Sequence, residues 1–475
     1  MKTPTRAHLL LLGILLIGLI LRVGAAVRLP SIHWPDEIFQ AQEPAHRLAY
    51  GYGIMTWEWR RGARSWVFPT FLAGVMRATA WMGAGSKGYE WGIAAVLSLI
   101  SLTIIWFAFA WNRRASGIEA AIIGAGACAI WYELVFFASK AFTEVLGAHL
   151  LLPGLYLGVY GEELSEKKRM FLAGIFCGLA TSLRIQLAPA VVFAAVWFCY
   201  PNWRKRTLPV AAGLVLPVLA FGMVDMMTWS YPFQSYFRIL WINMVEGRSK
   251  LYGVTPWYWY LLVLSERLGP MVFLAVLGIR RSPFLGWLAL IMLLTHSVFA
   301  HKEVRFLYPL APIVITLAAL GVAEITPVFN MGRKLPLTST TVVAGGLAFC
   351  ALSSALLVPH FDWSLRSGSL IAFDHLSQDS TLCGVGVYKT EWWETAGYAH
   401  LHRNVPILIL SRESELERES GSFNAIVSSG SLPGKLDDFA LAGCWNGLCL
   451  YHRAGPCTAP QKDLEFNQVL IRDDR

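Results

Sequence analysis

The sequence predicts an α-helical, polytopic membrane protein with a small α/β domain outside the cytoplasm. Three observations support this fold class. Of the 475 residues, 55% are hydrophobic and 15% are charged, and apolar runs of about 20 residues, the length that crosses a bilayer, recur along the chain. Basic residues collect in alternate connections between these runs. After residue 358 the apolar runs stop and short strand-like segments begin.

About eleven apolar segments are candidate spans. They are Leu9–Val27, Tyr89–Trp111, Gly117–Phe137, Phe142–Tyr160, Met170–Leu187, Ala188–Tyr200, Leu208–Thr228, Trp257–Ile279, Phe284–Ala300, Phe306–Ile325 and Thr338–Val358. We interpret the first as a retained anchor, although the small residues at 24–26 leave a cleaved signal peptide open. Ala188–Tyr200 is too short for an ordinary crossing. One interpretation is that this segment forms half of a re-entrant hairpin, which is broken near Arg184 and Pro189.

The charges of the connections predict the orientation. With the N-terminus in the cytoplasm, every predicted cytoplasmic connection is basic, as the positive-inside rule requires. These connections contain Arg113-Arg114, Lys167-Lys168-Arg169, Arg204-Lys205-Arg206, Arg280-Arg281 and Arg333-Lys334. The stretches rich in polar and aromatic residues then lie on the other face: 31–69, 132–144, 229–256 and 301–305. The pattern predicts one active site that faces away from the cytoplasm.

The first of these stretches, Ser31 to Pro69, is the most unusual in the chain. It carries His33, Asp36, Glu37, Glu43, His46, Glu58 and several arginines, interleaved with Trp34, Trp57, Trp59 and Trp66. Adjacent Asp36 and Glu37 behind Pro35 indicate a placed pair of acids. The alternative is an amphipathic segment that lies on the bilayer with its tryptophans among the headgroups.

Residues 359–475 are expected to form a soluble α/β domain, separate from the membrane domain of residues 1–358 with its first non-cytoplasmic loop at 28–88. Strands are predicted at Gly384–Tyr388, Val405–Leu410, Ala425–Ser428 and Leu448–His452, and a helix at 390–401. Four cysteines lie in this domain: Cys383, Cys444, Cys449 and Cys457. Outside the cytoplasm they allow three disulfide pairings, with a zinc site as the alternative. The other four cysteines, Cys128, Cys177, Cys199 and Cys350, lie within spans and are interpreted as small core residues.

Three motifs carry a family resemblance. HWPDEIFQ with EPAHRLAYGYGIMTWEWRRGARSWVFP (33–69), NMVEGRSKLYGVTPWYWY (243–260) and HKEVRFLYP (301–309) resemble the dolichyl-phosphate-mannose-dependent mannosyltransferases of glycosyltransferase family 22. These enzymes assemble glycolipid anchors and N-glycan precursors. Here Trp34 is inserted into the family's His-Pro-Asp-Glu opening, and Val304 replaces a frequent second acid. The resemblance implies a GT-C fold in a bacterial-type homologue, with its active site at the periplasmic face, or at the lumenal face in a eukaryote.

The resemblance also implies an activity. It indicates an inverting transfer of a mannosyl or related hexosyl residue from a polyprenyl-phosphate donor to a glycan or glycolipid acceptor. The family comparison places the catalytic acid in the first loop, and we predict Asp36 as the general base, with Glu37 as its helper. Adjacent side chains point apart, so the two are not expected to share a proton. Sugar or acceptor binding is assigned to Trp57, Glu58, Trp59 and Arg64.

The donor phosphate needs cations, which His301, Lys302 and Arg305 supply at the end of a span, with Arg184 as a fourth. Arginine offers a bidentate fork for phosphate, and His301 and Arg305 share a face if their segment is helical. The alternatives are snorkelling anchors that pair with Glu303, and, for Arg184, a hairpin tip at the interface. Lys140 and Glu144 have the spacing of a helix pair.

No cofactor is expected. The polar loops contain no metal-ligand spacing, which predicts a metal-independent reaction, and no basic soluble module indicates nucleic-acid binding. The expected partners are the lipid donor, the acceptor and the bilayer. A lipid transporter or flippase, or a non-catalytic assembly subunit, is the rival interpretation, although no inverted repeat is visible. The acceptor, the linkage and the role of the C-terminal domain are not determined by the sequence.

Overall fold

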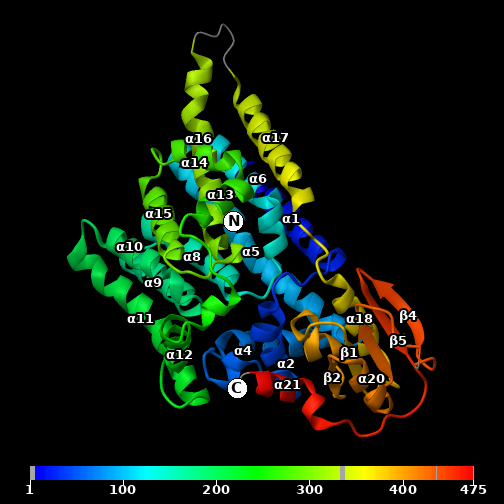
Figure 1. Ribbon diagram of the computed structural model, residues 1–475. Coiled ribbons are helices and arrows are strands. Elements are labelled where there is room, and N and C mark those ends of the chain that lie inside the picture. The colour runs from blue at the N-terminus through cyan, green and yellow to red at the C-terminus, as the bar shows by residue number, and fades with distance from the viewer. Residues whose placement is uncertain (1–5, 332–336, 435, 474–475) are drawn as a thin grey trace. The chain divides into compact units, whose positions relative to one another are not determined.

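The computed structural model describes residues 6–331, 337–434 and 436–473 (Figure 1). The chain divides into two compact units. The helical unit contains Met1–Ala25 and Leu97–Phe361, and the sheet unit contains Ala26–Val96 and Asp362–Arg475. The first loop, expected to belong to the membrane domain, is therefore grouped with the C-terminal residues.

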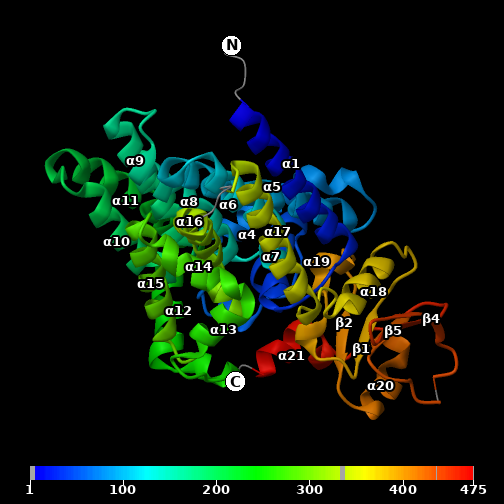
Figure 2. The same ribbon diagram turned by 90° about the horizontal axis from the view of Figure 1, so that it is seen from above.

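The helical unit is built from apolar helices that fall on the predicted spans, together with one helix at 234–240 in the predicted polar stretch 229–256 (Figure 2). Their bounds are α1 Arg6–Arg28, α5 Lys87–Ser116, α6 Ile118–Ile130, α7 Tyr132–Phe137, α8 Thr143–Tyr160, α9 Glu166–Leu183, α10 Ala188–Cys199, α11 Trp203–Thr228, α12 Gln234–Leu240, α13 Trp259–Leu268, α14 Pro270–Gly278, α15 Pro283–Ser297, α16 Ala311–Asn330 and α17 Ser339–Leu357. Helices α1 and α5 continue across the boundary between the units.

Small residues let these helices pack closely. A Cβ atom at Gly213 on α11 would lie 2.1 Å from the carbonyl oxygen of Phe171 on α9. One at Gly278 on α14 would lie 1.9 Å from the carbonyl oxygen of Leu317 on α16. Both crossings therefore require glycine, as is common where membrane helices approach through their backbones.

Several predicted spans are broken. The expected span Gly117–Phe137 is two helices, because the backbone of Trp131 is extended between α6 and α7. The break exposes the carbonyls at the end of α6, and the fully buried Arg22 of α1 donates to those of Cys128 (2.9 Å) and Ala129 (3.0 Å). Helices α13 and α14 meet at Gly269 with a bend of 101°.

The number of membrane crossings stays a prediction. Among the described residues, five helices are long and apolar enough to cross a membrane, or six if the bent pair is one span. Helices α6 and α15 and the segment Ile185–Cys199 are shorter apolar helices. The chain does break at Arg184, whose backbone is extended between α9 and a short 3₁₀ turn that leads into α10.

The sheet unit contains a five-stranded sheet in the order β2-β1-β3-β5-β4. The strands are β1 Val385–Tyr388, β2 Ile407–Leu410, β3 Ala425–Ser428, β4 Ala440–Trp445 and β5 Leu448–His452. Strand β1 pairs in parallel with β2 and β3, and β5 is antiparallel to β3 and β4. The helices of this unit are α2 Glu43–Tyr50, α3 Trp57–Arg60, α4 Val67–Thr79, α18 Ser367–Ser377, α19 Gly397–Leu401, α20 Glu413–Glu419 and α21 Phe466–Asp473, and a π-helical turn spans Glu37–Gln42.

Four of these strands confirm the predicted ones, and β4 was missed. Strand β4 forms a hairpin with β5 through Asn446 and Gly447, both with positive φ, in the manner of an Asn-Gly turn. The predicted helix at 390–401 is wrong as one element. A 3₁₀ turn at Trp392–Glu394 precedes α19. The extended backbone of Thr395 and the φ of +62° at Gly397, the first residue of α19, do not continue a right-handed helix.

The core of the sheet unit includes the first loop. Ile32, Ile38, Phe39 and Ile54 are buried in one cluster with residues of all the strands except β4, and with α18 and α21. A second cluster, built around Leu408, Phe423 and Ile426, contains Leu416 of α20. The hydrophobic side chains beside Asp36 therefore belong to the core that the C-terminal residues build.

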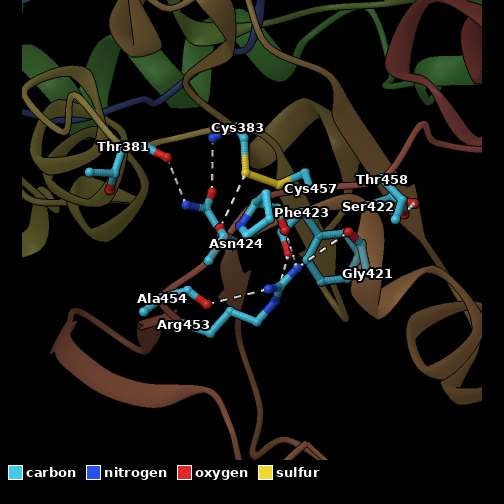
Figure 3. Close-up of a disulfide and its surroundings, with 12 residues drawn as sticks. Thr381, Cys383, Gly421, Ser422, Phe423, Asn424, Arg453, Ala454, Cys457 and Thr458 are labelled. Atoms are coloured by element: carbon cyan, nitrogen blue, oxygen red, sulfur yellow. Dashed lines mark hydrogen bonds between the residues drawn. A yellow bond between two sulfur atoms is a disulfide. The ribbon is translucent and has the colours of Figure 1, made fainter.

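Two disulfides pair the four cysteines of the C-terminal region. Cys383 bonds Cys457, and Cys444 bonds Cys449. Asn424 accepts a hydrogen bond from the Cys383 N–H (3.0 Å) and donates to the Thr381 carbonyl (2.9 Å), which fixes the start of β1 beside the first disulfide (Figure 3). All four thiols are used, so the zinc alternative has no thiolate ligands here. The cysteines within the spans are buried and unpaired in the described chain, which confirms their interpretation.

Candidate functional site

The predicted site residues form two groups, one in each unit. We call Asp36, Gln40, Thr56, Glu58 and Arg64 of the sheet unit the acid group. We call Glu144, Arg184, His301, Glu303 and Arg305 of the helical unit the cation group. Each group is connected internally by hydrogen bonds or ion pairs.

The acid group is organised by Gln40. Asp36 precedes the π-helical turn Glu37–Gln42, so its carboxylate lies over the amide of Gln40, which donates a hydrogen bond to Asp36 Oδ1. The same amide nitrogen donates to Glu58 Oε1 at 2.8 Å. Gln40 thus links the predicted base to the short helix α3, and Asp36 remains partly exposed.

Glu58 holds the other end of this network. Its Oε1 also accepts from Arg64 Nη2 at 3.0 Å, and its Oε2 accepts from the hydroxyl of Thr56 at 3.1 Å. Glu58 is buried and Arg64 half-buried, so the predicted sugar-binding pair is brought together as an ion pair. Gln40 and Thr56 lie within the family-like motif at 33–69, but no role was predicted for either, because these contacts depend on the loop conformation.

The tryptophans differ in exposure. Trp59 is 1% exposed and packs on Trp66, with 4.5 Å between ring centroids. Trp57, on the same short helix, is half-buried. Trp57 is thus the better placed of the two predicted tryptophans to contact a sugar.

Glu37 and the next acid along the chain, Glu43, lie inside the sheet unit. Glu37 is 5% exposed and starts the π-helical turn, whereas Asp36 faces Gln40. Glu43 accepts the N–H of Ile54 at 2.5 Å and that of Ala399 at 2.7 Å. Burial raises the pKa of Glu43 to about 7, although these N–H groups oppose the rise. Glu43 thereby ties the first loop to α19, a role that sequence reasoning missed.

The cation group is organised by Arg305. Its Nε and Nη2 donate to the two oxygens of Glu303, at 2.7 and 3.1 Å, and its Nη1 donates to Glu144 Oε1 at 2.9 Å. Arg184 approaches the other oxygen of Glu144 at 3.6 Å and stacks on the ring of Phe306 at 4.5 Å. Two arginines from distant parts of the chain therefore share the carboxylate of Glu144, which the sequence had suggested as a partner of Lys140.

The expected Lys140–Glu144 helix pair is wrong. Helix α8 begins at Thr143, so Lys140 lies outside it, and its ammonium group lies over the ring of Phe136 instead, at 5.2 Å from the centroid. Glu144, in the first turn of α8, is 2% exposed and turns to Arg305 and Arg184. Two arginines offset its buried charge better than one flexible lysine could.

His301 and Arg305 are held together by Glu303, as the pairing alternative predicted. They do not share an α-helical face, because residues 301–303 are non-helical and a 3₁₀ turn follows at Val304–Leu310. His301 Nε2 lies 3.1 Å from Glu303 Oε1. Burial alone would raise the pKa of Glu303, but Arg305 and His301 outweigh it and lower that pKa to about 2. The hydrogen bond to Glu303 in turn raises the pKa of His301.

Lys302 has a different environment from its neighbours. It is 6% exposed, and its ammonium group donates to the carbonyls of Phe299 (2.5 Å) and Thr255 (3.0 Å). Tyr260 donates to the carbonyl of Glu303 at 3.2 Å. The family-like motif at 243–260 is thereby joined to the segment that carries the cations.

The described residues contain no group of three or more His, Cys, Asp or Glu side chains placed to hold a metal ion. Neither group therefore offers a metal cage, and metal independence stays a prediction.

Comparisons with known proteins agree on the class of protein. A model of the Alg9-like mannosyltransferase family matches residues 13–402. GPI mannosyltransferase 3 of Yarrowia lipolytica is 27% identical over 418 residues, which covers 82% of this chain and 75% of that protein. GPI alpha-1,2-mannosyltransferase 3 of Homo sapiens is 22% identical over 428 residues, covering 86% and 73%.

The fold has a likeness among solved structures. ArnT from Cupriavidus metallidurans, bound to undecaprenyl phosphate, superposes with a TM-score of 0.62 at 14% identity, and the match covers 95% of this chain and 99% of that one. The same protein in the apo state gives a TM-score of 0.60 at 13% identity. At this level of identity the likeness concerns the fold.

Proposed function

Because the chain belongs to the Alg9-like mannosyltransferase family, we propose that it is an inverting enzyme that moves a mannosyl residue from a polyprenyl-phosphate donor to a glycolipid acceptor. The relatives named GPI alpha-1,2-mannosyltransferase 3 support the sugar and the acceptor class. The undecaprenyl phosphate bound to ArnT supports a polyprenyl-phosphate donor. The basic predicted cytoplasmic connections support a reaction on the opposite face of the membrane.

The observation that carries the proposal is the environment of Asp36. Its carboxylate is oriented by the Gln40 amide, and Gln40 is itself held by Glu58. The donated N–H holds the Asp36 carboxylate in one orientation, and a general base has to be oriented toward the proton that it accepts. Asp36 is also partly exposed, whereas Glu37 beside it is 5% exposed. Asp36 is therefore the better base of the two.

The reaction then takes one displacement. The acceptor hydroxyl oxygen bonds to the anomeric carbon while the bond from that carbon to the donor phosphate oxygen breaks. Asp36 takes the hydroxyl proton, and polyprenyl phosphate leaves with the bonding electrons. Attack opposite the leaving group inverts the anomeric centre.

The cation group offsets the charge of the departing phosphate. Arg184 carries the planar fork that suits a phosphate, and it lies 3.6 Å from Glu144, the carboxylate that it shares with Arg305. Arg305 positions Arg184 through the shared Glu144, and it positions His301 through Glu303. Lys302 fixes the backbone of this segment through its two carbonyl contacts.

Substitution of Asp36 tests the proposal. Asp36→Asn keeps the oxygen that accepts from Gln40 but cannot accept a proton near neutral pH. Turnover should fall by about 10²–10⁴-fold, the usual contribution of a general base. The assay incubates purified protein with polyprenyl-phosphate mannose and a glycolipid extract, and mass spectrometry of the lipids detects the product.

Glu37→Gln is the matched control, one residue away on the same turn. It should lower turnover less than Asp36→Asn does, at a similar yield of folded protein. A near-normal turnover of Asp36→Asn, or a deeper loss in Glu37→Gln, would assign the base to the other carboxylate. Absence of transfer by folded wild-type protein would favour the transporter or assembly-subunit interpretation.

A further inference from the structure

A cavity of about 410 Å³ opens in the helical unit, lined by residues outside both groups of the candidate site. It lies where α8 and α10 end and where α9 and α11 begin, and these four helices pack together in Figure 1 and Figure 2. Its polar and aromatic lining comprises Glu162, Glu166, Arg169, Trp197, Tyr200 and Arg206. The connections 161–169 and 200–206, which carry all of these residues except Trp197 of α10, belong to the predicted cytoplasmic face.

Arg169 is the side chain that the surrounding protein does not satisfy. It is 8% exposed, and it forms no side-chain hydrogen bond or ion pair with any described residue. Its stem passes Gly161, where a Cβ atom would lie 3.2 Å from Arg169 Cδ. A largely buried arginine whose guanidinium has no protein partner favours an anion in the space that the guanidinium faces.

The carboxylates of the cavity do not meet this demand. Glu166 accepts from Arg206 Nε at 2.6 Å, and Arg206 also donates to the carbonyls of Phe198 (3.2 Å) and Tyr200 (3.3 Å). Glu162 pairs with Arg114 at 3.4 Å. Each acid in the lining already has an arginine partner, and Arg169 is the cation that remains.

The surroundings match a phosphate group at a membrane surface. Arginine binds phosphate through its planar fork. Lys167, Lys168, Arg204 and Lys205 flank the cavity in sequence and add positive charge. Trp197 and Tyr200 are 40% and 69% exposed at the end of α10, as is typical of aromatic residues at headgroup depth.

Apolar surface continues from the cavity along the helices. Val196 on α10 is 51% exposed, and Leu208 on α11 is 76% exposed. A ligand with a phosphate in the cavity could thus lay acyl chains on these side chains. We propose that this cavity binds the phosphate headgroup of an anionic phospholipid, with Arg169 as its principal ligand.

Native mass spectrometry of the purified full-length protein tests the site. Phosphatidylglycerol is titrated into the detergent-solubilised protein, with diacylglycerol as a lipid that lacks the phosphate. Arg169→Gln should weaken retention of phosphatidylglycerol by about tenfold or more, because a buried charge-assisted contact is lost. Arg113→Gln is the matched control, since it removes an exposed arginine from the last turn of α5. It should change retention by no more than about twofold, because an exposed charge is screened.

Further arms keep the outcome clear. Arg169→Lys keeps the charge and loses the fork, so this variant should retain less phosphatidylglycerol than wild type and more than Arg169→Gln. It also serves as the test variant if Arg169→Gln does not fold. Inorganic phosphate at millimolar concentration should not displace the lipid. If it does so in an Arg169-dependent way, the site takes a free phosphate and the lipid assignment is overturned. Equal retention by wild type and both Arg169 variants, or equal retention of diacylglycerol, would overturn the whole proposal.

Discussion

The buried contact between Arg305 and Glu144 predicts strong energetic coupling. The two side chains are 5% and 2% exposed, and Nη1 lies 2.9 Å from Oε1. Arg305→Met removes the cation and keeps most of the volume, which leaves Glu144 with Arg184 alone, at 3.6 Å. Glu144→Gln removes the buried charge and keeps its shape. The double variant replaces both charged partners by neutral groups.

The size of the expected loss of stability follows from the burial of the pair. Removing one partner of a buried ion pair costs about 3–5 kcal/mol, because the other charge is left without compensation. We therefore expect Arg305→Met to lower the free energy of unfolding by about 3–5 kcal/mol. Glu144→Gln should lower it by about 2–3 kcal/mol, since Arg305 keeps its bonds to Glu303. The double variant should be more stable than the sum of the single effects predicts, by about 2 kcal/mol or more, because residue 144 then carries no charge that has lost its nearer cation.

Equilibrium unfolding in mixed detergent micelles measures this coupling, with the fluorescence of the 20 tryptophans as the signal. The matched control is the exposed pair Arg281–Glu324, whose side chains are 38% and 24% exposed. That pair should couple by no more than about 1 kcal/mol. Single effects at Arg305 and Glu144 that add to within about 0.5 kcal/mol would refute the assignment of Arg305 as the centre of the cation group.

Two further predictions concern the sheet unit. Burial raises the pKa of Glu43 to about 7 from its ordinary 4.5, so between these values the folded state binds a proton that the unfolded chain has released. The free energy of unfolding should therefore fall by up to about 3 kcal/mol as pH rises from about 4.5 to 7. The melting temperature of Glu43→Gln should depend less on pH over that window than that of wild type. Equal pH dependence of the two proteins would contradict the prediction. Replacing Cys383 and Cys457 by serine should cost about 4 kcal/mol, against about 2 kcal/mol for Cys444 and Cys449, because the closed loops have sequence separations of 74 and 5. Melting of the two double variants checks the order, and an equal loss would contradict the loop-entropy argument.

The features that could be predicted from the sequence are those that depend on neighbouring residues: motifs, apolar runs and strand-forming segments. The motifs at 33–69, 243–260 and 301–309 indicated the family that the match over 13–402 confirms. Apolar runs placed a helix on every expected span, and the helical fold resembles that of ArnT. Four strands followed from their β-branched, apolar residues. Strand β4 did not, because its Ala-Leu-Ala-Gly start has little strand preference and its side chains are mostly exposed.

Partners distant in sequence could not be predicted. The spacing of Lys140 and Glu144 fits a helix pair, but the helix starts too late to make it. Glu144 instead joins Arg184 and Arg305, which lie 40 and 161 positions away in the chain. Such a contact depends on which helices pack together, and a single sequence does not state this. The same holds for Glu43, whose partner Ala399 is 356 positions away.

The grouping of the first loop with residues 362–475 bears on what the C-terminal region does. Ile38 and Phe39, directly after Asp36 and Glu37, are each 2% exposed in the core that the sheet builds. Ile32 donates its N–H to the Leu365 carbonyl at 2.8 Å, and Met55 donates to the side chain of Asn467 at 3.0 Å. Backbone and core contacts therefore hold the loop on both sides of the predicted base. Because a general base has to be held in place to act, the proposed role of Asp36 predicts that the C-terminal region aids catalysis by fixing the first loop, even without touching a substrate.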